Sequence, residues 1–252
     1  MSFTVAADSY DRFMGRYSVP LASKLADFAA IAAGQRVLDV GCGPGALTTE
    51  LVRRLGAPLV WAVDPSEPFV AAARERHAGV AVQQAAAERL PFDDQAFDAA
   101  LAQLVVHFMA DPVAGLREMA RVTRKGGIVA ACVWDHAGGQ APPTPFWAAA
   151  RSLQPDVDDE SQLAGAREGH LAQLFGEAGL SEVAESALSI SVEHPSFEDW
   201  WEPFMLGVGP AGAHVTGLDA GRQAQLRERC RELLPPPPFV LTSRAWAARG
   251  LA

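Results

Sequence analysis

Hydrophobic and polar positions along the chain follow two periods. Short apolar runs of strand length are separated by segments in which apolar residues recur every three or four positions, as Leu21, Leu25 and Phe28 do after a candidate helix cap at Ser18. The strands predicted in the first half of the chain are 36–40, 59–63, 80–85, 97–102 and 128–134. The helices predicted between them are 46–55, 67–78 and 111–124, the last one stopped by the Lys-Gly-Gly run at 125–127. This alternation predicts an α/β fold, with a parallel sheet and helices on both faces.

The pattern changes after residue 136. Residues 138–145 are rich in glycine and proline and residues 155–160 are acidic, so a surface excursion is predicted there. Regular elements then return as a helix at 168–178, a strand at 183–193, an aromatic helix at about 197–206, a glycine-rich loop, a charged helix at about 219–234 and a last strand from 239. No internal repeat is visible, and the length of the chain favours a single domain.

Composition narrows the class of protein. A chain of 252 residues that is 49% hydrophobic can bury one sizeable core. The net charge is −9 and the basic residues are scattered, so we expect no nucleic-acid partner. No signal peptide and no apolar run of about 18 residues is visible, and we expect a cytoplasmic protein that does not enter a membrane. Cys42, Cys132 and Cys230 lie far apart, which predicts neither a disulfide framework nor a metal site.

The string V-L-D-V-G-C-G-P-G at 37–45 is the main candidate for chemistry. A strand, a glycine turn and a helix in this order form a nucleotide-type site at the carboxyl edge of an α/β sheet. The dinucleotide pattern G-x-G-x-x-G/A fits nominally as Gly41, Gly43 and Ala46, with Asp64 about 20 residues further on. An NAD-dependent oxidoreductase is therefore one alternative.

The charges in the same string argue against NAD. Asp39 would be repelled by two phosphates, and Pro44 removes one of the backbone amides that would bind them. S-adenosylmethionine has no phosphate and presents an ammonium and a sulfonium, which a carboxylate suits directly or through water. The pattern favours this cofactor, and a non-catalytic protein that binds the cofactor or a partner is a second alternative.

These residues and the later motifs resemble the class I S-adenosylmethionine-dependent methyltransferases, within them the small-molecule group that includes ubiquinone and menaquinone enzymes. The resemblance covers most of the chain. It implies a doubly wound, seven-stranded, mostly parallel sheet of the Rossmann-like methyltransferase fold, with an antiparallel last strand and a helical lid insertion. It also implies one methyltransferase domain over 1–252, with a cofactor-binding core at about 34–136 and the lid and C-terminal strands at about 137–252.

The resemblance assigns roles to individual residues. Asp64, in W-A-V-D-P-S, matches the acidic residue that binds both ribose hydroxyls, since one carboxylate can hold a vicinal diol. A-A-A-E-R-L-P-F at 85–92 resembles the adenine loop, although many relatives have Asp where this chain has Ala86. The segment S-Y-D-R-F-M-G-R-Y-S at 9–18 is similar to a stretch that folds over the cofactor, and it offers Arg16 to the cofactor carboxylate. The cofactor-binding residues expected from the resemblance are Tyr10, Arg16, Asp39, Gly41, Gly43, Asp64, Pro65, Ala87, Glu88, Gln103 and Leu104.

The methyl acceptor is expected on the far side of the cofactor. In F-D-A-A-L-A-Q-L-V-V-H-F the match places His107 toward the acceptor, where it binds the acceptor or removes a proton, or else is an ordinary rim residue. Trp200, Trp201 and Phe204 either bury a lid helix or line an apolar acceptor pocket. The implied reaction is transfer of a methyl group to a nucleophilic O, N or C atom of a small, largely apolar molecule, with no metal. The motifs leave the acceptor open, because lid residues select it.

Overall fold

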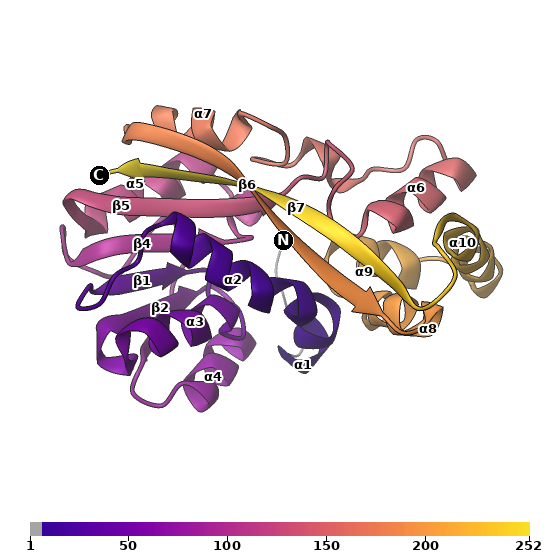
Figure 1. The fold of residues 1–252 in the computed structure, drawn as a ribbon, viewed down its shortest axis with the longest axis horizontal. Coiled ribbons are helices and arrows are strands. Elements are labelled where there is room, and N and C mark those ends of the chain that lie inside the picture. The colour runs from indigo at the N-terminus through magenta and orange to yellow at the C-terminus, as the bar shows by residue number, and fades with distance from the viewer. Residues whose placement is uncertain (1–6) are drawn as a thin grey trace.

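A computed structural model describes residues 7–252 of the chain, so residues 1–6 of the predicted domain lie outside it (Figure 1). The strands are β1 (Val37–Val40), β2 (Val60–Asp64), β3 (Ala81–Gln84), β4 (Phe97–Gln103), β5 (Thr123–Trp134), β6 (Ser181–His194) and β7 (Phe239–Leu251). They form one seven-stranded sheet in the order β3-β2-β1-β4-β5-β7-β6. Only β7 runs antiparallel to its neighbours, β5 and β6. The predicted doubly wound, seven-stranded, mostly parallel sheet with an antiparallel last strand is confirmed.

Helices cover both faces of this sheet. They are α1 (Ala7–Tyr10), α2 (Arg16–Phe28), α3 (Ala46–Leu55), α4 (Glu67–Arg76), α5 (Pro112–Val122), α6 (Thr144–Leu153), α7 (His170–Glu177), α8 (Phe197–Trp201), α9 (Gly209–Thr216) and α10 (Ala220–Leu233). Residues of α2 and α3 share one hydrophobic core with one face, and residues of α5 and α7 share a second core with the other. No helix between residues 7 and 252 is long and apolar enough to cross a membrane.

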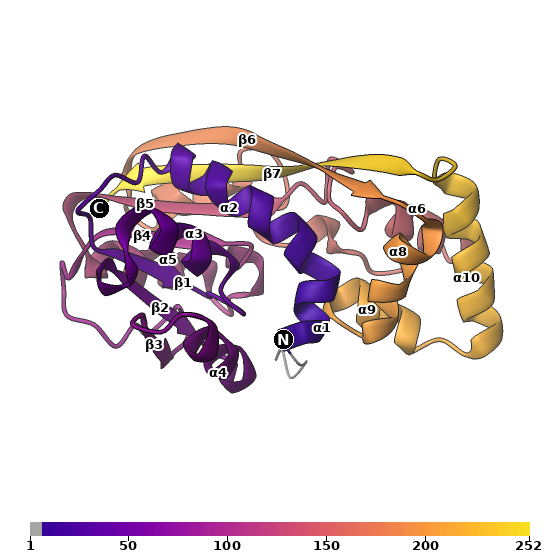
Figure 2. The same ribbon diagram turned by 60° about the horizontal axis from the view of Figure 1, so that its bottom comes forward.

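A separate group of helices lies beyond the sheet. The long strands β6 and β7 extend past the other strands of the sheet and reach α8 and α10, beside α6 and α9 (Figure 2). We call α6, α8, α9 and α10 the helical group. Its core is a cluster of buried aromatic and aliphatic side chains, among them Phe146, Trp147, Trp201, Phe204 and Leu226. The helical group therefore has a hydrophobic core distinct from the two cores that flank the sheet.

Four sequence-based predictions were wrong in detail. The predicted surface excursion contains α6, whose Phe146 and Trp147 are buried, and the predicted glycine-rich loop contains α9. Each of these helices has a proline in its first turn, where proline favours a helix start rather than a loop. Ser18 lies inside α2, since a π-helical turn at Asp11–Gly15 leads directly into that helix. Strand β5 begins at Thr123, before the glycines expected to precede it.

Candidate functional site

The turn after β1 is tightly held against the sheet. Gly41, Gly43 and Gly45 have φ angles of 71°, 53° and 102°, a region that favours glycine. A Cβ on Gly41 would lie 2.5 Å from a methyl carbon of Val105, so the backbone must approach that side chain closely. The amides of Gly41 and Cys42 both donate to the carbonyl of Val63, at 2.8 and 2.9 Å. These bonds fix the turn at the carboxyl ends of β1 and β2.

Asp64 is also tied to this turn. Its Oδ2 accepts a 2.8 Å hydrogen bond from the Gly43 amide, and its Oδ1 accepts one of 2.8 Å from the Ser66 amide. Burial raises the pKa of this carboxyl, while the two amide bonds act in the opposite direction. Each carboxylate oxygen keeps a further lone pair, so Asp64 can still accept hydrogen bonds from a bound diol.

A cavity of about 360 Å³, which we call the main cavity, lies at this edge of the sheet. It brings together most of the predicted cofactor residues: Tyr10, Gly41, Asp64, Pro65, Ala87, Glu88, Gln103 and Leu104. Glu88 joins the predicted adenine loop to the start of α5, because its Oε1 accepts a 2.7 Å bond from the Ala110 amide. Phe69, Phe108 and Met109 also line the cavity, and nothing in their spacing distinguished them from core residues.

Asp39 faces a smaller cavity of about 20 Å³ whose lining also includes Tyr10, Gly41 and Gln103. One oxygen, Oδ2, accepts a 2.6 Å bond from Thr48 Oγ1. The other, Oδ1, and Oε1 of Gln103 are buried without a hydrogen-bond partner among the described residues. Burial raises the pKa of Asp39 to about 7. Two unpaired acceptor oxygens in one place form a site suited to a cationic group of a ligand.

A second cavity, of about 40 Å³, adjoins the main one. Tyr10, Leu104 and Phe108 line both. Leu104 has a φ of 61°, which is costly for a leucine, and its amide donates a 2.9 Å bond to the Cys132 carbonyl. The rest of the second cavity is lined by Phe13, Met14, His107, Trp134, His136, Pro143, Glu160, Val208, Gly209, Pro210 and Ala211. Residues of the N-terminal segment and of α9 thus close it, together with His107 from the sheet edge.

Besides Tyr10, three titratable side chains line the second cavity. Burial lowers the pKa of His107 to about 3 and that of His136 to about 4, so both imidazoles are neutral at physiological pH. Burial raises the pKa of Glu160 to about 7. Oε2 of Glu160 accepts a 2.7 Å bond from Trp147 Nε1, and its Oε1 lies 3.9 Å from Nε2 of His136. Sequence reasoning missed Glu160, because it ends a stretch of acidic residues with the pattern of a solvated loop.

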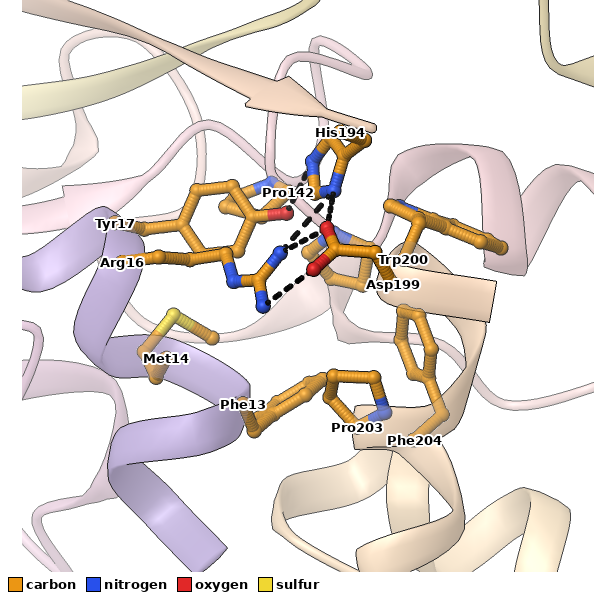
Figure 3. Close-up of a pocket in the computed structure, with 11 residues that line it drawn as sticks. Phe13, Met14, Arg16, Tyr17, Pro142, His194, Asp199, Trp200, Pro203 and Phe204 are labelled. Carbon is orange, nitrogen blue, oxygen red and sulfur yellow. Dashed lines mark hydrogen bonds and ion pairs between the residues drawn. The ribbon is translucent and has the colours of Figure 1, made fainter. Parts of the chain in front are cut away.

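Arg16 does not line either of these two cavities. Its Nη1 lies 2.5 Å from Oδ2 of Asp199, which also lies 3.0 Å from Nδ1 of His194 (Figure 3). The other ring nitrogen of His194 is 3.1 Å from the Tyr17 hydroxyl. This cluster joins α2 to the end of β6 and to α8. The predicted contact of Arg16 with the cofactor carboxylate would require its guanidinium to leave Asp199.

The aromatic residues of α8 and the turn after it do not line the second cavity, which His107 lines. Trp200 and Phe204 line a third cavity of about 10 Å³ beside Arg16 (Figure 3), and this cavity shares Phe13, Met14 and Pro143 with the second one. Trp201 stacks on Phe197 inside the helical group, with ring centroids 6.1 Å apart. The helical-group residues that do line the second cavity come from the segment 208–211 at the start of α9.

Comparison with known proteins agrees with this geometry. Residues 38–131 match a family described as Methyltransferase domain. An uncharacterised methyltransferase of Mycobacterium tuberculosis (strain ATCC 25618 / H37Rv) is 38% identical over 135 residues, which are 54% of this chain and 52% of that protein. A demethylmenaquinone methyltransferase of Mycobacterium sp. (strain KMS) is 43% identical over 102 residues, 40% of this chain and 43% of that protein. These matches span about half the length of the curated relatives, or less.

A solved structure extends the likeness to the whole fold. Geranyl diphosphate C-methyltransferase from Streptomyces coelicolor A3(2), in complex with Mg²⁺, geranyl diphosphate and S-adenosyl-L-homocysteine, superposes with a TM-score of 0.56 at 16% identity. The superposition covers 94% of this chain and 80% of that one. Residues 38–131 therefore resemble a methyltransferase domain, the superposition shows the same fold over most of the chain, and the resemblance to methyltransferases inferred from the sequence is confirmed.

Proposed function

We propose that this protein transfers a methyl group from S-adenosylmethionine to a nucleophilic O, N or C atom of a small, largely apolar molecule. The observation that carries the proposal is the shared wall of the two cavities, formed by Tyr10, Leu104 and Phe108. A cofactor in the main cavity and an acceptor in the second would meet there. Proximity and alignment of two reactants supply much of the acceleration in a displacement of this kind.

The residues around the main cavity fit the cofactor. Asp64 would bind the ribose hydroxyls with its remaining lone pairs, and the backbone at Ala87 would meet the adenine ring. Asp39 and Gln103 offer their unpaired buried oxygens to the cationic end of the cofactor. When bound, S-adenosylmethionine supplies a methyl carbon activated by the sulfonium.

The protein's own contribution is to position the acceptor and exclude water. Tyr10, Leu104 and Phe108 place apolar atoms around the meeting point, and low polarity there strengthens the attraction between an electron-rich nucleophile and the sulfonium. His107 is neutral and its Nδ1 has no partner within residues 7–252. This nitrogen can form one hydrogen bond with the acceptor and so orient it.

Binding measurements separate this function from its two alternatives. We expect calorimetry to show that S-adenosylmethionine and S-adenosylhomocysteine bind and that NAD does not, since Asp39 would repel a pyrophosphate. Tight binding of NAD with none of the sulfonium compound would instead support an oxidoreductase. Cofactor binding without release of S-adenosylhomocysteine over a broad panel of small acceptors would support a non-catalytic binding protein.

A further inference from the structure

Glu160 is a carboxyl group in an apolar place. It opens a short 3-10 turn, Glu160–Gln162, and only 6% of its surface is exposed. Carboxylates are rarely buried this far unless they are paired with a cation. Within the described residues it has no Lys or Arg partner; its contacts are the Trp147 indole N–H at 2.7 Å and the neutral His136 at 3.9 Å. A buried carboxyl without a cation is costly, so it is a candidate for a functional role.

Three polar groups that line the second cavity, His107, His136 and Glu160, are neighbours. The ring centroid of His107 lies 6.1 Å from that of His136 and 3.9 Å from that of Phe108, which belongs to the shared wall. His136 in turn lies beside Glu160. Phe13, Met14 and the segment 208–211 add apolar walls, whereas Tyr10 and Trp134 add a hydroxyl and an indole N–H to the lining. Among the described residues, Glu160 is the only carboxyl group that an acceptor in this cavity would meet.

We propose that Glu160 is the general base of the second cavity, where it binds an acidic hydroxyl group of the acceptor, a phenol or an enol, and takes its proton. This inference rests on the proposed function. In the step, the acceptor O–H bond breaks and its proton moves to the Glu160 carboxylate. The oxygen forms a bond to the methyl carbon while the carbon–sulfur bond breaks and its electron pair stays on sulfur. The products are a methyl ether, a neutral thioether and a protonated Glu160, which returns its proton to solvent.

The charges favour a hydroxyl over an ammonium group. The methyl donor is a cation, and in a desolvated cavity it repels a second cation but attracts an oxygen that is becoming anionic. Of the four titratable groups that line the cavity, Glu160 has a pKa near the working pH, whereas His107 and His136 are far weaker bases and burial raises the pKa of the Tyr10 hydroxyl to about 12. Asp159 adds a negative charge next to Glu160 and so favours its protonated form, while the Trp147 N–H favours the carboxylate. Asp135, on the other side of His136, is paired with Arg244.

The first test compares Glu160→Gln with Asp158→Asn. Glutamine keeps the shape of Glu160 and an oxygen that can accept from Trp147, but it cannot take a proton. Asp158 is an exposed carboxylate two residues before Glu160 and does not line the cavity, so its variant is a matched control. Calorimetry on protein loaded with S-adenosylhomocysteine measures binding of phenol, para-nitrophenol and alpha-naphthol, with benzylamine as the cationic comparison. We expect Glu160→Gln to weaken phenol binding about tenfold, with unchanged affinity for S-adenosylhomocysteine, and the control to match the wild type.

The second readout is the rate at which S-adenosylhomocysteine forms from the phenols at saturating S-adenosylmethionine. Loss of a general base should lower this rate about 100-fold in Glu160→Gln and remove its rise with pH near neutrality. If Glu160→Gln folds poorly, Trp147→Phe replaces it: without the indole N–H the carboxylate is less favoured, so the rise in rate should move to higher pH.

Four results would overturn the inference. The first two are that the loaded wild type binds no phenol, or that Glu160→Gln has the phenol affinity and the rate of the wild type. The other two are that benzylamine binds more tightly than the phenols, or that the pH profile of Trp147→Phe is that of the wild type. A wild-type protein that fails to bind S-adenosylhomocysteine at all would overturn the proposed function itself, and calorimetry reports this before any acceptor is added.

Discussion

The backbone N–H of Gly43 donates a 2.8 Å hydrogen bond to Oδ2 of Asp64. This bond links the glycine turn after β1 to the acidic residue that ends β2. The other carboxylate oxygen holds the Ser66 amide just before α4. Asp64 therefore has a structural role, in shaping two loops, in addition to the ribose contact that we propose for it.

We expect Asp64→Ala to lower the affinity for S-adenosylhomocysteine by roughly 2 to 4 kcal/mol, because two charge-assisted hydrogen bonds to the ribose are lost and the turn loses its anchor. Calorimetry measures the change, and a melting curve checks that the fold survives. Asp98→Asn is a suitable control, since Asp98 pairs with Arg124 and lines neither of the two adjoining cavities. An affinity within a factor of two of the wild type would show that Asp64 does not bind the ribose.

Asp39 should make cofactor binding depend on pH. Its pKa is raised to about 7 in the folded protein from 3.8, because burial disfavours the charged form. Its contribution to the stability of the free protein is therefore fully present below about pH 4 and is lost as the pH rises through about 7. A bound cation favours the carboxylate, so binding of S-adenosylmethionine should release a proton, and its affinity should increase between about pH 6 and pH 8.

Calorimetry in buffers of different ionisation enthalpy measures this proton release directly. Asp39→Asn removes the titrating group, and we expect weaker binding with little dependence on pH in that range. The comparison uses the same ligand for both proteins, so that any titration of the ligand itself cancels. A wild-type affinity that stays constant from pH 6 to pH 8 would rule out a direct contact between Asp39 and the cation.

Gly41 and Gly34 provide a test of the glycine turn. Both have positive φ angles, 71° and 87°, so alanine costs about 1–2 kcal/mol of backbone strain at either position. At Gly34 a Cβ would meet no atom within 4 Å, whereas at Gly41 it would lie 2.5 Å from Val105. We expect Gly41→Ala to lower the melting temperature more than Gly34→Ala does, and only Gly41→Ala to weaken cofactor binding. Equal melting temperatures would show that the turn can move away from Val105.

The meeting of the predicted cofactor residues at the main cavity, where we propose that the cofactor binds, was predictable because the signals are local. An apolar strand followed at once by a glycine turn leaves few alternatives for 37–45, and Asp64 follows the next apolar run directly. Parallel strands bring their carboxyl ends to one edge, so residues that end separate strands meet there. The structure accordingly lines the main cavity with Gly41, Asp64, Gln103 and Leu104.

The acceptor side was less predictable because it depends on contacts between distant parts of the chain. Arg16 pairs with Asp199, which is 183 residues further on, and no local sequence pattern predicts that pair. In the sequence Glu160 has the pattern of a solvated acidic loop, and only the structure shows that Trp147 of α6 binds it. The helix α6 was not predicted from the sequence, because the glycine and proline residues before it are compatible both with a loop and with the start of a helix.

The last prediction concerns Trp200 and Trp201, which the sequence offered as acceptor-binding residues. They are only 2% and 4% exposed, and Trp200 packs 4.9 Å from the Phe204 ring, in the aromatic core of the helical group. Truncation of either to alanine should therefore cost about 3–5 kcal/mol of folding free energy. For a chain of this size that loss lowers the melting temperature by roughly 10 °C.

Cofactor affinity, measured well below the melting temperature, should change little in either tryptophan variant, because neither residue lines the main cavity. Met205→Ala is the control from the same segment: Met205 is 39% exposed, and we expect its change to stay within about 0.5 kcal/mol. Val208→Ala tests the second cavity, which Val208 does line. It should weaken acceptor use more than either tryptophan variant does, once each rate is corrected for the folded fraction. The contrary outcome is that Trp201→Ala leaves the melting temperature unchanged and impairs acceptor use alone. That outcome would show that Trp201 contacts the acceptor directly. The helical group would then have to take another position over the site when an acceptor is bound.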